Sequence, residues 1–123
     1  MKREALAALL VTVGLMAASL LGMTVFLGAH PLWSVRTGVI GSTSGLVVYA
    51  VLRLAGLRPT PLAIFGALAL AALGLVVVQG KAFFVASFAE NVLAGRFWFL
   101  GWFGVMAASC LTLSALAAVV LRR

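Results

Sequence analysis

Four long apolar runs dominate the chain, separated by short segments that contain proline or charged residues. The runs cover about residues 4–29, 37–57, 61–80 and 97–121. A helix needs about 20 apolar residues to cross the hydrocarbon core of a bilayer, which is roughly 30 Å thick. The turns at 30–36 and 58–61 are only long enough to reverse the chain. The pattern therefore predicts an all-α integral membrane protein with one domain, residues 1–123, built as an antiparallel bundle of four transmembrane helices.

The connection between the third and fourth runs has a mixed pattern. Phe84, Phe88 and Val92 recur at helical spacing, while polar residues fall elsewhere on the wheel, and Gly95 follows. This periodicity predicts a short amphipathic helix at the membrane surface over about residues 82–94. A bent extension of the third run is the alternative interpretation of the same pattern.

Composition supports the membrane interpretation. Hydrophobic residues make up 65% of the chain and charged residues only 9%, with a mean hydropathy of +1.26. Soluble domains carry about 25% charged residues, so this chain has too little polar surface to dissolve in water. The net charge of +7 is common in nucleic-acid-binding proteins, but the basic residues flank the apolar runs and form no cluster interleaved with aromatics. We therefore expect a lipid bilayer, and no nucleic acid, as a partner.

The basic residues also predict an orientation. With both termini in the cytoplasm, six basic residues lie inside and three outside, as the positive-inside rule favours. The inner six are Lys2, Arg3, Arg53, Arg58, Arg122 and Arg123, and the outer three are Arg36, Lys81 and Arg96. The sequence thus predicts a multi-pass membrane protein with both termini cytoplasmic.

The second run, 37–57, is the only apolar run with a polar centre. On a helix, Gly38, Ser42, Gly45, Tyr49 and Arg53 share one face, and Ile40, Val47, Val51 and Leu54 lie towards the other. Glycines four residues apart allow another helix to approach closely, and hydroxyls can bond back to carbonyls one turn earlier. Alternatively, the hydroxyls supply oxygens to an ion path. The candidate residues for packing or for such a path are Gly38, Gly41, Ser42, Thr43, Ser44, Gly45 and Tyr49.

Residues that carry chemistry are few. Glu4 and Glu90 are the only acidic residues, His30 is the only histidine, and Cys110 is the only cysteine. One histidine cannot supply paired haem ligands or a zinc-binding cluster without a second subunit, and Cys110 has no base beside it in the apolar run. We therefore expect no enzymatic activity, no metal and no cofactor, with Cys110 a small packing residue.

The outer surface offers a second candidate site. Glu90 and Asn91 lie near Arg96 in the third connection and are expected to face Arg36 across this surface. These four residues form a candidate gate or docking point. The alternative interpretation is that they are charges anchored at the lipid headgroups, where an exposed ion pair contributes at most about 1 kcal/mol.

Residues 30–56, HPLWSVRTGVIGSTSGLVVYAVLRLAG, resemble the corresponding region of the ATP synthase protein I family. Those are small four-helix bacterial proteins in which an aromatic-containing turn precedes a glycine- and serine-rich second helix ending in basic residues. The resemblance implies a bacterial inner-membrane protein that assists an ion-translocating ATPase. We therefore expect a non-enzymatic accessory or assembly subunit whose partners are other membrane subunits. A homo-oligomeric small-ion channel or transporter, with its path along the second helix, is the alternative.

Overall fold

The computed structural model describes residues 2–122, and this part of the chain contains five helices and no strand. The helices are α1 (Lys2–Leu20), α2 (Met23–Phe26), α3 (Ser34–Leu54), α4 (Pro59–Ala86) and α5 (Val92–Leu121). The predicted all-helical class is confirmed. Four of these helices, all except the short α2, are long and apolar enough to cross a membrane.

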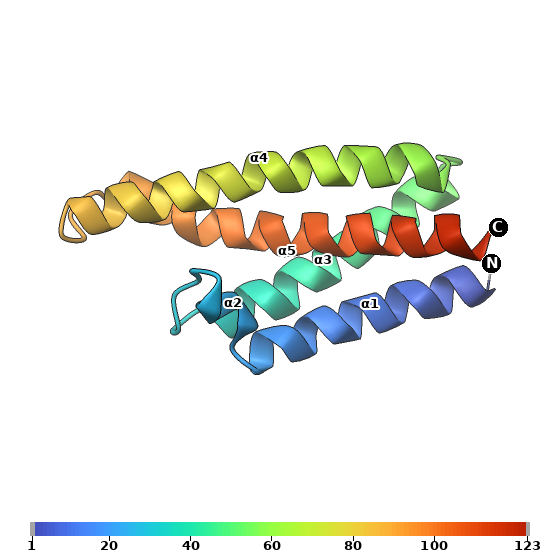
Figure 1. Ribbon diagram of the computed structural model, residues 1–123, viewed down its shortest axis with the longest axis horizontal. Coiled ribbons are helices and arrows are strands. Elements are labelled where there is room, and N and C mark those ends of the chain that lie inside the picture. Colours follow the sequence, from blue (N-terminus) through green and yellow to red (C-terminus); the bar gives the residue numbers. More distant parts are fainter. Residues whose placement is uncertain (1, 123) are drawn as a thin grey trace.

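Helix α5 is the centre of the structure. It packs against α1, α3 and α4, whereas α4 packs extensively only on α5. Figure 1 shows both described ends of the chain beside the α3–α4 turn, with α2 and the α4–α5 turn at the opposite end. We call these the terminal end and the hairpin end. As a result, segments far apart in sequence meet at each end of the molecule.

The first run does not form the single helix predicted for residues 4–29. Helix α1 stops at Leu20, and Gly22 adopts φ +86°, a left-handed conformation that glycine tolerates without steric cost. The short α2 follows and ends before Gly28, which has φ +117°. These glycines interrupt the helix well before Pro31, because a left-handed residue cannot continue a right-handed helix.

The separate surface helix predicted for residues 82–94 is also wrong. Helix α4 continues to Ala86, a short turn follows, and α5 begins at Val92 rather than near residue 97. No glycine or proline interrupts residues 81–86, and Phe84 packs against Trp98 of α5 with ring centroids 5.6 Å apart. Of the three residues whose spacing predicted a surface helix, Phe84 lies in the extended α4, Phe88 lies in the turn and Val92 is the first residue of α5.

The turn between α4 and α5 is closed by strained backbone and by a cap. Phe88 and Ala89 both have positive φ, 54° and 68°, which is unfavourable for residues with a side chain. The Asn91 side chain accepts a hydrogen bond from the Ala94 N–H at 3.0 Å and so caps α5. The Ser87 hydroxyl in turn accepts from the Asn91 N–H at 2.9 Å.

Candidate functional site

The structure separates the polar residues predicted on the second run. Thr43 and Ser44 are exposed, and the other five candidates are buried: Gly38, Gly41, Ser42, Gly45 and Tyr49. The apolar residues expected on the opposite side of α3, such as Ile40 and Val47, are exposed. The buried side of α3 faces α1 and α5.

Two glycines on this buried side lie where helices cross closely. A Cβ at Gly41 would lie 2.7 Å from the Phe103 carbonyl oxygen and 2.8 Å from the Met106 Cβ. A Cβ at Gly45 would lie 2.8 Å from the Cys110 Cβ. Atoms in ordinary contact stay about 3.5–4.0 Å apart, so α3 and α5 could not keep this spacing with any larger residue. This geometry supports the packing interpretation of these positions.

The three hydroxyl groups at the centre of α3 do not converge. Thr43 and Ser44 donate back to the carbonyls of Val39 and Ile40, at 2.7 and 2.8 Å. The buried Ser42 hydroxyl has no hydrogen-bond partner among the described residues. Within one chain, the hydroxyls therefore do not form a continuous row of oxygens that could replace the water around an ion.

A charged cluster at the terminal end was not predicted from the sequence. Arg53 Nη2 lies 2.8 Å from Glu4 Oε2 and 3.0 Å from Glu4 Oε1, and Arg122 Nε lies 3.6 Å from Glu4 Oε1. The Arg53 and Glu4 side chains are only 13% and 12% exposed, whereas that of Arg122 is 57% exposed. Glu4 therefore joins α1 firmly to α3 and weakly to the end of α5. The only sequence feature that could have indicated this cluster is that Glu4 and Arg53 are expected at the same membrane surface.

Aromatic side chains gather at the hairpin end. His30 lies between Trp33 and Trp98, with ring centroids 5.9 and 5.7 Å away, and Trp98 Nε1 donates to the Gly28 carbonyl at 3.1 Å. His30 Nδ1 accepts the Leu32 N–H at 3.1 Å. His30 thus closes the turn before α3 and packs on the neighbouring indoles.

The candidate outer-surface residues are exposed but are not joined to one another. Within residues 2–122, no ion pair of 4.0 Å or less connects Glu90 to Arg36 or Arg96. Asn91 acts as the cap of α5. Glu90 and Arg96 remain available on the surface around the α4–α5 turn.

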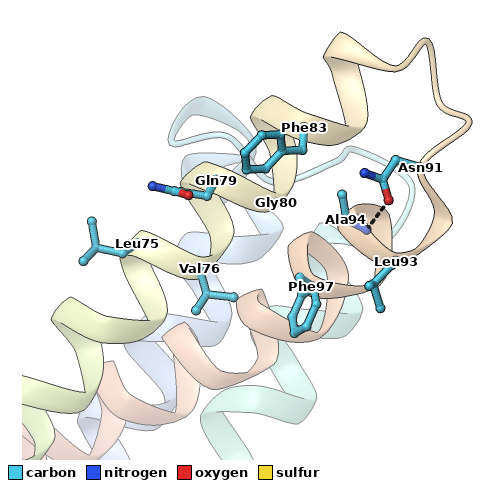
Figure 2. Close-up of a pocket in the computed structure, with 9 residues that line it drawn as sticks. All are labelled: Leu75, Val76, Gln79, Gly80, Phe83, Asn91, Leu93, Ala94 and Phe97. Atoms are coloured by element: carbon cyan, nitrogen blue, oxygen red, sulfur yellow. Dashed lines mark hydrogen bonds between the residues drawn. The ribbon is translucent and has the colours of Figure 1, made fainter.

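Beside this turn lies a groove of about 490 Å³ that the sequence did not reveal. Figure 2 shows Gln79 and Phe83 projecting from α4, Leu93 and Phe97 from α5, and Asn91 where the turn joins α5. The remaining lining residues are Leu75, Val76, Gly80 and Ala94. Apart from two amides, the walls are apolar. The groove depends on how α4 and α5 pack, so no local pattern could predict it.

Residues 2–122 hold no cluster of three or more histidine, cysteine or acidic residues that could bind a metal ion. Cys110 is fully buried, with its Sγ 3.3 Å from the Thr12 hydroxyl in the contact between α1 and α5. Such a thiol has no access to a substrate in this structure.

Comparison with protein-family models finds no match to this chain. Comparison with curated proteins finds no match either. No solved structure is similar enough to be counted as a match. The relationship to the ATP synthase protein I family therefore stays a prediction, and the functional argument rests on the structure's own features.

Proposed function

We propose that this chain is a four-span membrane protein, with antiparallel helices and cytoplasmic termini, that serves as a non-enzymatic accessory or assembly subunit of a larger membrane complex. Spacing along α3 supports the membrane placement. Arg53 and Trp33 lie 20 residues apart in sequence, which at 1.5 Å per residue is about 30 Å. That is about the thickness of the hydrocarbon core, with arginine at one surface and tryptophan at the other, as membrane interfaces favour.

The observation that carries the proposed role is the excess length of α4 and α5. Helices of 28 and 30 residues are about 42 and 45 Å long. At a typical tilt of about 20°, α4 still extends roughly 10 Å beyond a 30 Å hydrocarbon core. Since the arginines of the terminal end mark one surface, the excess lies at the hairpin end. We call residues 81–97 the hairpin tip.

The hairpin tip is apolar where a protein surface in water is normally polar. Phe88 is 92% exposed, and Phe83, Val92, Leu93 and Phe97 are each more than half exposed. Burying a large apolar side chain contributes about 1.5–3 kcal/mol, so covering several of them with a partner protein would be strongly favourable. The hairpin tip also carries the charged residues Lys81, Glu90 and Arg96. Apolar surface bordered by charged residues is typical of protein interfaces.

This proposal assigns the outer-surface residues a docking role. Glu90 and Arg96 would form the polar rim around the apolar tip and its groove, and the spans would hold the tip at a fixed height. The candidate complex is an ion-translocating ATPase, on the sequence resemblance alone.

The test is purification of the full chain from its native membrane in mild detergent, followed by mass determination of the complex. Phe88→Asn removes the exposed ring while keeping a residue that tolerates the left-handed conformation. Ala89→Gly is the matched control, because it relaxes the same turn without removing apolar surface. We expect proteins other than this chain to copurify both with the wild type and with Ala89→Gly. The same proteins should be lost with Phe88→Asn.

A homo-oligomer with no other protein would contradict the accessory role and favour the channel. The channel has less support, because Thr43 and Ser44 already bond to their own helix. Selective ion flux from the purified chain in vesicles, lost when Ser42, Thr43 and Ser44 are all replaced by alanine, would reverse this preference.

A further inference from the structure

A second pocket lies at the terminal end, between the start of α4 and the end of α5. Its volume is about 390 Å³, and its lining consists of Arg58, Pro59, Thr60, Pro61, Val119 and Arg122. Arg58 immediately precedes α4 and Arg122 immediately follows α5, so the packing of these two helices brings two arginines to one cavity. We propose that this pocket binds the phosphate of an anionic phospholipid headgroup.

The polar groups of this pocket favour an anion. Its polar lining residues are two arginines and a threonine, Arg58, Arg122 and Thr60, and no lining residue is acidic. Arginine suits phosphate because its planar group of N–H donors matches the phosphate oxygens. Pro59 and Pro61 carry no N–H, so the start of α4 contributes little by itself. The side chains therefore form the site.

Charge at the terminal end supports the same ligand. Glu4 is the only acidic residue there, and Arg53 occupies both of its carboxylate oxygens. Arg58 forms no ion pair within residues 2–122, and Arg122 reaches Glu4 only through Nε, at 3.6 Å. The two arginines of the pocket consequently keep most of their N–H donors for a second anion.

The position of the pocket favours a lipid over a soluble anion. The next turns of both helices expose apolar side chains, including Ile64 on α4 and Leu116 and Val120 on α5. In the proposed placement the pocket lies at the cytoplasmic membrane surface, where basic pockets between transmembrane helices bind anionic headgroups. Acyl chains would then follow the exposed apolar surface towards the bilayer centre. This inference requires the four membrane spans but not the accessory role.

The test measures lipid binding to the purified, delipidated chain in neutral detergent, with phosphatidylglycerol and phosphatidylcholine as probes and native mass spectrometry as the readout. We expect the wild type to retain phosphatidylglycerol preferentially. Each arginine near such a surface strengthens binding about fivefold. Arg58→Gln should therefore weaken phosphatidylglycerol binding about fivefold, and Arg58→Gln with Arg122→Gln should weaken it about 30-fold.

The matched control is Arg36→Gln with Arg96→Gln, which removes the same charge from the hairpin end and should leave binding unchanged. Equal losses from the two double variants would overturn the proposal, since net charge alone would explain them. If the Arg58/Arg122 double variant does not fold, Arg58→Gln alone decides, because Arg58 is exposed and lies outside the helices. The opposing result is a wild type that shows no lipid preference but is stabilised by inorganic phosphate, while the Arg58/Arg122 double variant is not. That result would identify a soluble phosphate ligand and overturn the lipid assignment.

Discussion

Replacing Gly45 by alanine tests whether close approach of α3 and α5 holds the structure together. The added Cβ would lie 2.8 Å from the Cys110 Cβ and 2.9 Å from the Ala107 Cα. Normal contacts need about 3.5–4.0 Å, so the helices must separate by roughly 0.7–1.2 Å. Some of the opposing atoms, such as the Ala107 Cα, belong to the backbone of α5 and therefore cannot rotate away. Overpacking of this kind costs about 1–3 kcal/mol.

Gly74→Ala is the matched control, because a Cβ there meets nothing within 4 Å. Both changes gain the same intrinsic helix propensity, about 1 kcal/mol for glycine to alanine, so this gain cancels in the comparison. We expect Gly45→Ala to be less stable than Gly74→Ala by about 1–3 kcal/mol. The free energy of unfolding can be measured by titrating a denaturing detergent into mixed micelles while following the helical circular dichroism. Equal stabilities of the two variants would refute the close crossing at Gly45.

Two further predictions concern the terminal end and the topology. A double-mutant cycle with Glu4→Gln and Arg53→Gln should give a coupling energy of about 1–3 kcal/mol, because these charge-assisted bonds lie in a poorly exposed site. The corresponding cycle with the exposed Arg122 should give at most about 1 kcal/mol, and similar values for both cycles would contradict the geometry. Reporter fusions at Arg58 should report the cytoplasm and fusions at Glu90 the opposite side, and any fusion with the reverse result would rule out the proposed orientation.

The sequence by itself determined the helical class, the four long apolar helices and which side of α3 is buried. These features depend on local properties: the number of consecutive apolar residues and their spacing around a helix. Gly38, Gly45 and Tyr49 recur on one face whatever the partner helix is, so their burial could be predicted. The same periodicity predicted helix at Phe84 and Val92, but it could not show that these residues belong to α4 and α5 themselves.

The contacts between helices were decided only by the tertiary structure. The Glu4–Arg53 pair joins residues 49 positions apart, and the Arg58–Arg122 pocket joins residues still further apart along the chain. Both depend on α5 lying at the centre, with α4 on one side and α1 and α3 on the other. In an apolar chain every helix has a surface that another could cover, and hydropathy does not specify which pair will meet. Close packing at positions such as Gly41 and Gly45 selects the partners, because only there can the helix backbones approach without collision.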